Sequence, residues 1–272
     1  MRAKLVYVVK ALARRLVWGT AELFDRSGGD DELLPPRRLS FVGRGDFRST
    51  GEEYLGHFRE LGGLKPSDRV LDQGCGIGRM AIPLMGYLEG GSYAGFDVGK
   101  EMIRWCQREI TPRRPEFEFT WAPIHNRKYN PFGTLDGDQF RFPYPDSSFD
   151  FTFATSLFTH LLKGEVEHYL AETARVLRPG GTCLMTFFIL DAQARAELDA
   201  GRTAFDFRHP VEGGLTTDPR QPEEAIAFDV DVVREMFSAA GLSIREPFNR
   251  GQWSNVPGGV AGQDVVVASR PV

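Results

Sequence analysis

The 272-residue sequence contains only three cysteines, Cys75, Cys106 and Cys183. An odd and sparse set without a C-x-x-C pair indicates neither a disulfide framework nor a thiolate zinc site. No uncharged run approaches the roughly 18 apolar residues that span a bilayer. The formal net charge of −4 provides no general attraction to nucleic acid. These absences predict a cytoplasmic protein with reduced thiols, no transmembrane segment and no nucleic-acid partner.

Residues 2–24 place apolar side chains at helical spacing and interrupt them with lysine and arginine. These charges, and the lack of a clean small-residue cleavage site, argue against a secretory signal. Two interpretations stay open. The segment is either a helix that packs on its own domain or a second subunit, or a basic amphipathic helix on an anionic membrane surface. The second would make the protein membrane-peripheral, and the sequence does not decide the oligomeric state.

From residue 55 onward, strand-like and helix-like segments alternate along the chain. A short helix is expected at 55–61, strands at 69–72, 93–96, 117–121, 149–155, 182–189, 242–244 and 265–268, and further helices at 80–88, 102–110, 165–177 and 232–237. This alternation predicts an α/β fold with a doubly wound, mostly parallel sheet that carries helices on both faces.

The same pattern divides the chain into four predicted segments. Residues 1–54 form an N-terminal helix and a connecting stretch, because 26–51 are rich in Gly, Asp, Pro and Arg. Residues 55–190 form the α/β core. Residues 191–227 interrupt the alternation and are interpreted as a lid or substrate-binding insertion. Residues 228–272 supply the last helix and the last two strands.

A glycine-rich turn follows the first predicted strand, in the run VLDQGCGIGR from Val70 to Arg79. Glycines at Gly74, Gly76 and Gly78 allow a sharp bend and close approach of a ligand to the backbone. Asp97 ends the second strand, where its carboxylate suits the two hydroxyls of a ribose.

The spacing of this turn favours one cofactor over another. Dinucleotide-binding turns follow G-x-G-x-x-G, but Arg79 stands here in place of the third glycine. Asp72, just before the turn, would put a negative charge near a pyrophosphate. The same carboxylate suits a ligand that carries an ammonium and a sulfonium, as S-adenosylmethionine does. A nicotinamide-dependent oxidoreductase is therefore disfavoured.

Four blocks in this order resemble the class I, Rossmann-like S-adenosylmethionine-dependent methyltransferases of the methyltransferase-11-like branch. They are VLDQGCGIGR, YAGFDVGKEMI, FRFPYPDSSFDFTFATSLFTHL and ARVLRPGGTCLMTFF, and they span roughly residues 70–190. The resemblance implies a seven-stranded sheet whose final strand is antiparallel. It also implies a cofactor site with defined residue roles.

The resemblance assigns the cofactor contacts as follows. Asp72 lies near the amino group, Asp97 on the ribose, and Asp138 at the adenine amino group. Gln139 and Phe140 flank the ring, Val98 joins Asp97, Arg79 reaches the methionine carboxylate, and the backbone of Thr155 meets the aminoacyl end.

Methyl transfer to a hydroxyl also needs a base that removes the hydroxyl proton. His160 follows the fourth strand, beside the expected position of the methyl group, and is the first candidate; the alternative is a structural, hydrogen-bonding histidine. His125 is the second candidate, with a surface-loop histidine as its alternative. The acceptor pocket is predicted to involve Tyr129, Arg208, His209 and Trp253, each of which has an ordinary packing, rim or surface alternative.

The sequence thus predicts an S-adenosylmethionine-dependent O-methyltransferase of a small polar acceptor, with a sugar or glycoconjugate favoured. Phe205, Phe207 and Arg208 in the insertion suit a polar ring. N- or C-methylation of another metabolite, and a non-catalytic cofactor-binding module, stay open as alternatives. No metal is expected, because Ala154-Thr155-Ser156 replaces the acid that metal-dependent relatives place after the fourth strand.

Overall fold

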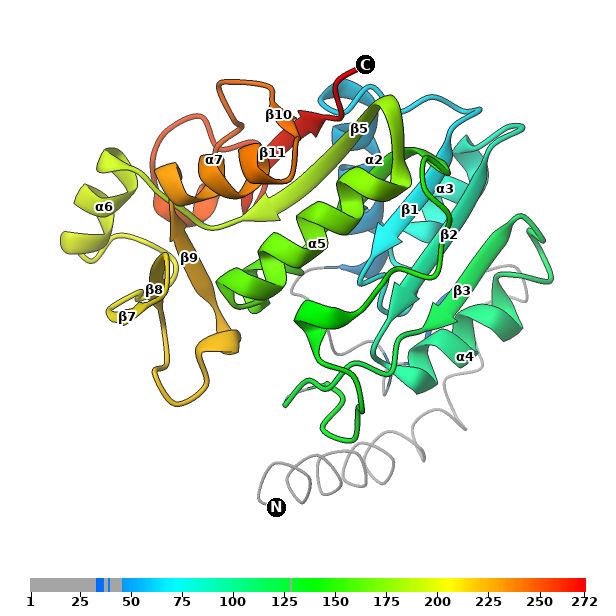
Figure 1. Cartoon of the computed structure of the whole chain (residues 1–272), viewed down its shortest axis with the longest axis horizontal. Coiled ribbons are helices and arrows are strands. Elements are labelled where there is room, and N and C mark those ends of the chain that lie inside the picture. Colours follow the sequence, from blue (N-terminus) through cyan, green and yellow to red (C-terminus); the bar gives the residue numbers. More distant parts are fainter. Residues whose placement is uncertain (1–32, 37–38, 40–45, 128) are drawn as a thin grey trace. The chain divides into compact units, whose positions relative to one another are not determined.

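The computed structural model describes residues 33–36, 39, 46–127 and 129–272, so the predicted helix within residues 2–24 lies outside the described residues. Seven of the strands form one sheet (Figure 1). Their order in the sheet is β10 (Ser243–Ile244), β11 (Asp264–Ser269), β5 (Leu177–Phe187), β4 (Phe149–Ala154), β1 (Arg69–Gln73), β2 (Ser92–Asp97) and β3 (Phe117–Trp121). The pairs β1–β4, β4–β5 and β2–β3 are parallel, whereas β11 is antiparallel to β5. The predicted α/β fold class, including the antiparallel final strand, is confirmed.

The described residues form two compact units. The first contains the described residues up to His57 together with Lys65–Ser67 and Gly74–Phe140. The second contains Phe58–Leu64, Asp68–Gln73 and Arg141–Val272.

The first unit contains two parallel strands with helices. Its elements are α3 (Ala81–Tyr87), β2 (Ser92–Asp97), α4 (Lys100–Glu109), β3 (Phe117–Trp121) and η1 (Gly137–Gln139). Tyr93 of β2 stacks on Phe117 of β3, with ring centroids 5.0 Å apart. Aromatic side chains on facing strand positions bury large apolar areas and fix the pairing of the strands.

Helix α2 (Phe47–Glu60) begins inside the stretch that was predicted to be a connecting segment. The Asp46 carboxylate accepts hydrogen bonds from the amides of Arg48 and Ser49, at 3.1 and 2.9 Å. An aspartate at this position satisfies amides that the first helical turn leaves without partners. The prediction that the connecting segment extends to residue 51 was therefore wrong. The helix begins at Phe47, because Asp46 acts as its N-terminal cap.

The second unit contains the central strands and their helices. Its elements are β1 (Arg69–Gln73), β4 (Phe149–Ala154), η2 (Phe158–His160), α5 (Lys163–Val176), β5 (Leu177–Phe187), α7 (Val230–Ala239), β10 (Ser243–Ile244), η4 (Gln252–Ser254) and β11 (Asp264–Ser269). Helices α5 and α7 pack together, and α5 also contacts β5 (Figure 1). The side chains of Cys183, Leu184 and Phe187 are fully buried, as expected for a central strand.

Strand β5 starts at Leu177, five residues before its predicted start. Pro179 and Gly180 were expected to close the preceding helix but lie within the strand, where the pairing with β4 shifts register between Phe149 and Phe151. A β-bulge of this kind accommodates residues that cannot continue a regular ladder.

The predicted insertion at 191–227 has secondary structure of its own. It contains α6 (Ala192–Asp199), β7 (His209–Val211), β8 (Gly214–Thr216), η3 (Pro222–Glu224) and the start of β9 (Ile226–Asp229). Together with β6 (Ile189–Leu190), these strands form a second sheet in the order β6-β9-β8-β7. Its buried cluster comprises Phe188, Leu190, Ala194, Phe207, Ala225, Ala227 and Trp253. The insertion is thus a small folded layer rather than a bare loop.

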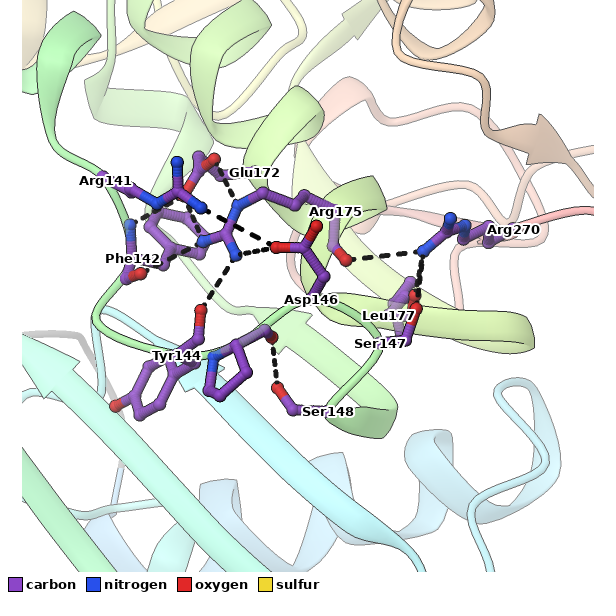
Figure 2. Close-up of polar contacts among 11 residues, drawn as sticks. Arg141, Phe142, Tyr144, Asp146, Ser147, Ser148, Glu172, Arg175, Leu177 and Arg270 are labelled. Carbon is purple, nitrogen blue, oxygen red and sulfur yellow. Dashed lines mark hydrogen bonds and ion pairs between the residues drawn. The ribbon is translucent and has the colours of Figure 1, made fainter.

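A polar network centred on Arg175 fixes the segment that leads into β4 (Figure 2). The Arg175 guanidinium donates to the Glu172 carboxylate at 2.6 and 2.7 Å and to the Tyr144 carbonyl at 2.8 Å. Burial raises the pKa of Glu172. Hydrogen bonds from Arg175 and from the Phe142 amide lower it by more, so the net shift is downward. Because this carboxylate is buried, it needs these donors to stay ionised in the folded protein.

None of the helices in the described part of the chain has an apolar stretch long enough to cross a bilayer.

Candidate active site

The glycine-rich turn lies in the first unit and is fastened to the end of β2. The amides of Gly74 and Cys75 both donate to the Phe96 carbonyl, at 2.9 and 3.0 Å. Gly76 and Gly78 have φ angles of 54° and 77°, in the left-handed region that favours glycine. A Cβ on Gly78 would lie 2.8 Å from Ile110 Cδ1, whereas a Cβ on Gly76 would meet nothing within 4 Å. Gly78 therefore allows close packing, and Gly76 leaves open space beside the turn.

Asp97 links this turn to the start of α4. Its carboxylate accepts from the Gly76 amide at 2.9 Å and from the Gly99 amide at 2.7 Å. Burial raises the pKa of Asp97 above its ordinary value, and these two hydrogen bonds oppose that shift without cancelling it. A carboxylate has about four lone-pair sites, so two bonds leave acceptor capacity for the hydroxyls of a ribose.

Trp121, which the sequence analysis did not single out, fixes the residue next to Asp97. Its indole N–H donates to the Val98 carbonyl at 3.0 Å, and Lys100 Nζ lies 4.2 Å from the centroid of the Trp121 rings. Trp121 is the last residue of β3 and pairs in register with Asp97, so its position at the end of an alternating strand was the signal that could have identified it. It holds the backbone of Val98 in place.

The predicted adenine-contacting residues lie on the short helix η1 and directly after it. Phe140 is buried, and its ring centroid lies 5.5 Å from that of Phe96 on β2. Asp138 and Gln139 are exposed. The long loop before them closes on itself, because the His125 amide donates to the Leu135 carbonyl at 2.7 Å. The chain thereby returns η1 to the end of β2, where the resemblance requires it.

Arg79 has a different neighbourhood from the one expected. Its guanidinium carbon lies 5.4 Å from the centroid of the Phe47 ring on α2. The same side chain lines a pocket of about 310 Å³ together with Phe47, Arg48 and Arg113. Burial lowers the pKa of Arg79, and nearby Asp46 and Tyr54 oppose that shift. Its contact with a methionine carboxylate stays a prediction.

Asp72 and Thr155 belong to the second unit. Asp72 is buried on β1, where it pairs in register with Phe153 of β4. Thr155 is half-buried and directly follows β4. Both residues stand at the carboxyl ends of neighbouring parallel strands, the edge at which α/β sheets bind ligands.

His160 lies on η2, also in the second unit, and is half-buried. Its Nδ1 lies 3.0 Å from the carbonyl oxygen of Glu223, which is 63 residues further along the chain. A carbonyl oxygen only accepts hydrogen bonds, so Nδ1 carries the proton in the neutral ring. Nε2 then holds the lone pair, which is the form that a general base requires.

The second candidate base and three of the predicted acceptor contacts are exposed or half-buried. His125, Arg208 and His209 are exposed, and Arg208 pairs with Asp206. Tyr129 is half-buried, and its amide donates to Asn126 Oδ1 at 2.9 Å.

Trp253 requires a correction. It is only 2% exposed, and its indole N–H donates to Asp264 Oδ2 at 2.6 Å. It packs at right angles to Phe207, which is also buried. Trp253 is therefore a core residue rather than part of the lining of an acceptor pocket, because the folded insertion covers it.

The Asp264 carboxylate, which holds Trp253, also accepts from the amides of Ile189 and Gly251, at 2.8 and 2.7 Å. Asp264→Ala should lower the free energy of unfolding by about 3 kcal/mol, because it leaves buried donors without a partner. Asp206→Ala, which removes an exposed ion pair, should cost less than about 1 kcal/mol. Urea unfolding measures both variants, and equal losses would contradict this role of Asp264.

The same group predicts a pH dependence of stability. Burial raises the pKa of Asp264 to about 6, from 3.8, although its hydrogen bonds oppose the shift. The folded protein therefore takes up this proton at a higher pH than the unfolded chain does. The contribution of Asp264 to stability should grow as the pH falls from above 6 toward 4. Asp264→Asn should lack this component in urea unfolding at pH 7.5 and pH 5.

Metal and thiol chemistry find little support here. In the ranges that the structure covers, no group of three or more His, Cys, Asp or Glu side chains is placed to hold a metal ion. The three cysteines are buried and reduced, and burial raises the pKa of Cys183 to about 12. A thiol in this state is a poor nucleophile.

Comparisons with known proteins agree with this geometry. Residues 71–185 match the family model described as a methyltransferase domain. A fatty-acid O-methyltransferase of Mycolicibacterium smegmatis is 30% identical over 62% of this chain and 49% of its own length. A 27-O-demethylrifamycin SV methyltransferase of Amycolatopsis mediterranei is 31% identical over 51% of this chain and 46% of its own length. The chain thus spans about half the length of these curated relatives.

A solved structure shows the same fold. A SAM-dependent methyltransferase of Methanosarcina mazei superposes with a TM-score of 0.53 at 22% identity, over 77% of this chain and 95% of its own. The glycine turn with its open face at Gly76, and the half-buried Asp97 with remaining acceptor capacity, fit the nucleoside of S-adenosylmethionine. Over its α/β core, and in the family match at residues 71–185, the chain is similar to the class I S-adenosylmethionine-dependent methyltransferases.

Proposed function

We propose that the protein transfers a methyl group from S-adenosylmethionine to a hydroxyl oxygen of a small polar acceptor. The observation that carries this proposal is the state of His160. The Glu223 carbonyl, 3.0 Å from Nδ1, keeps the proton on that nitrogen and leaves Nε2 as a proton acceptor. An alcohol needs such a base at neutral pH, because its own proton is held too tightly to leave unaided.

The residues divide the work between binding and proton transfer. Asp97 holds the ribose. Val98, the η1 residues Asp138 and Gln139, and Phe140 directly after η1 lie beside the adenine, and Gly74, Gly76 and Gly78 let the backbone approach the nucleoside. The sequence resemblance assigns Asp72, Arg79 and Thr155 to the aminoacyl end. Orientation of this kind supplies much of the rate of a displacement reaction.

S-adenosylmethionine, held at Asp97 and the glycine turn, would supply an electrophilic methyl group for the acceptor oxygen and would leave as S-adenosylhomocysteine. The acceptor proton moves to Nε2 of His160, which becomes an imidazolium. The Glu223 carbonyl continues to accept from Nδ1 and stabilises that cation.

The names of the two curated relatives support oxygen as the methylated atom, since one is a fatty-acid O-methyltransferase and the other acts on 27-O-demethylrifamycin SV. The sugar hypothesis loses part of its basis, because Phe207 is buried and Phe205 packs against the same cluster. Arg208 and His209 stay exposed, and Tyr129 half-buried, as candidates for contact with the acceptor. The proposal therefore specifies a hydroxyl-bearing small molecule.

A transfer assay tests the proposal. The full chain is incubated with methyl-labelled S-adenosylmethionine and matched acceptors: methyl glucoside, trans-1,2-cyclohexanediol, cyclohexanol and cyclohexylamine. The expected product is a base-stable methyl ether. Label found only on the amine or on carbon would replace O-methylation with one of the alternatives. Tight binding of S-adenosylhomocysteine without transfer to any acceptor would favour a non-catalytic module.

A further inference from the structure

A strained turn follows β4. Ser156 has a φ angle of 54°, in a region that residues other than glycine rarely adopt. Its amide donates to Thr186 Oγ1 at 2.7 Å, and Thr186 is fully buried in β5. A buried partner thus maintains a backbone conformation that costs about 1–3 kcal/mol. Strain of this kind is concentrated at functional sites, and the catalytic scheme above makes no use of Ser156.

Ser156 is joined to a side chain from a distant part of the sequence. Its hydroxyl donates to Gln263 Oε1 at 3.2 Å. Gln263 directly precedes Asp264, which pairs in register with Phe187 at the carboxyl end of β5. The Asp264 carboxylate is held by three N–H donors, so the start of β11 is well fixed. Ser156 and Gln263 therefore meet at the carboxyl edge of β4 and β5, the ligand-binding edge of such sheets.

The hydrogen-bonding groups of this pair determine what it complements. Because Gln263 Oε1 accepts from Ser156, the amide is oriented with its NH₂ group as a pair of donors. The Ser156 oxygen has committed its proton to Gln263 and keeps lone pairs that can accept. A donor beside an acceptor matches a hydroxyl, which both accepts and donates. A carboxylate, which has no proton, would leave the Ser156 oxygen without a donor.

We propose that Ser156 and Gln263 form an acceptor subsite that binds a second hydroxyl, adjacent to the hydroxyl that is methylated. This inference rests on the proposed O-methyl transfer and specifies its substrate class as compounds with vicinal hydroxyls. His160 lies in the same connection between β4 and α5, four positions after Ser156, and serves the reacting hydroxyl. Gln263 selects the acceptor through its NH₂ group, and Ser156 both orients that amide and accepts from the ligand.

Binding of a matched pair of probes tests the subsite directly. The full chain, loaded with S-adenosylhomocysteine, is titrated with trans-1,2-cyclohexanediol and with cyclohexanol. The side-chain NH₂ signals of Gln263 are followed by NMR and assigned by their loss in Gln263→Leu. The diol should shift these signals and bind about tenfold more tightly than cyclohexanol, the difference expected for one additional hydrogen-bonded group.

Variants separate recognition from folding. Ser156→Ala and Ser156→Gly both remove the hydroxyl and should weaken diol binding by a similar factor, about five- to tenfold. Only the glycine variant relieves the strain of the positive φ angle. Its melting temperature should therefore be higher than that of the alanine variant. Gln263→Glu, which replaces the NH₂ donors with an acceptor, should abolish the preference for the diol. Affinity for S-adenosylhomocysteine should stay within about twofold in every variant.

Three results would overturn the subsite: equal affinity for diol and cyclohexanol, no shift of the Gln263 signals with either probe, or unchanged diol binding in Gln263→Leu. Failure of the proposed function has a different signature. In that case the diol would still bind at Gln263, but no methyl group would reach oxygen in any acceptor.

Discussion

His160→Ala is expected to lower the rate of methyl transfer to a hydroxyl acceptor by about 100- to 10,000-fold, the range for a positioned general base. The Glu223 carbonyl fixes Nδ1 as the protonated nitrogen, so the substitution removes the lone pair that Nε2 carries in this tautomer. Cofactor affinity should change little, because the ring serves the acceptor. Initial rates with labelled cofactor, combined with calorimetric titration of S-adenosylhomocysteine, measure both quantities.

The pH profile distinguishes catalysis from a structural role. In the wild type, the rate should fall as the pH drops and the His160 ring becomes protonated, since an imidazolium cannot accept the acceptor proton. In His160→Ala this limb should disappear. His168→Ala, which changes a half-buried histidine of α5, is the matched control and should retain the wild-type rate and profile. Full activity of His160→Ala on a hydroxyl acceptor would remove the base from the mechanism.

Asp97→Ala is expected to weaken binding of S-adenosylhomocysteine by about 100-fold or more. The substitution removes a carboxylate that can accept from two ribose hydroxyls, and hydrogen bonds to a charged group contribute about 1.5–3 kcal/mol each. It also releases the amides of Gly76 and Gly99, which donate to Asp97 at 2.9 and 2.7 Å. The glycine turn would thereby lose its link to the start of α4.

Calorimetry on the variant and on a control tests this expectation. Glu118→Ala changes an exposed carboxylate on β3 and should leave the affinity unchanged. Because burial raises the pKa of Asp97, wild-type affinity should begin to fall at a higher pH than an exposed aspartate would give. Asp97→Asn should remove that pH dependence. An unaltered affinity in Asp97→Ala would refute the assignment of the ribose site.

The order of strands and helices was predictable, because hydrophobic periodicity is a local property of the sequence. The strand at 117–121 was predicted with its observed bounds. Errors occurred where a single side chain or a register shift overrides the pattern, as at the Asp46 cap of α2 and the early start of β5. The extra sheet in the insertion was missed, because its short strands are defined by pairing partners rather than by periodicity.

The sequence by itself determined the glycine turn and the acid that closes it. Gly74, Gly76 and Gly78 need conformations that other residues resist, and Asp97 must end a strand, so their spacing already specifies the geometry. Only the tertiary structure decided that Trp253 is a core residue, that Nδ1 carries the proton in the neutral His160 ring, and that the Ser156 hydroxyl contacts Gln263. Each of these facts depends on a contact between residues far apart in the chain, and no local pattern encodes such a contact.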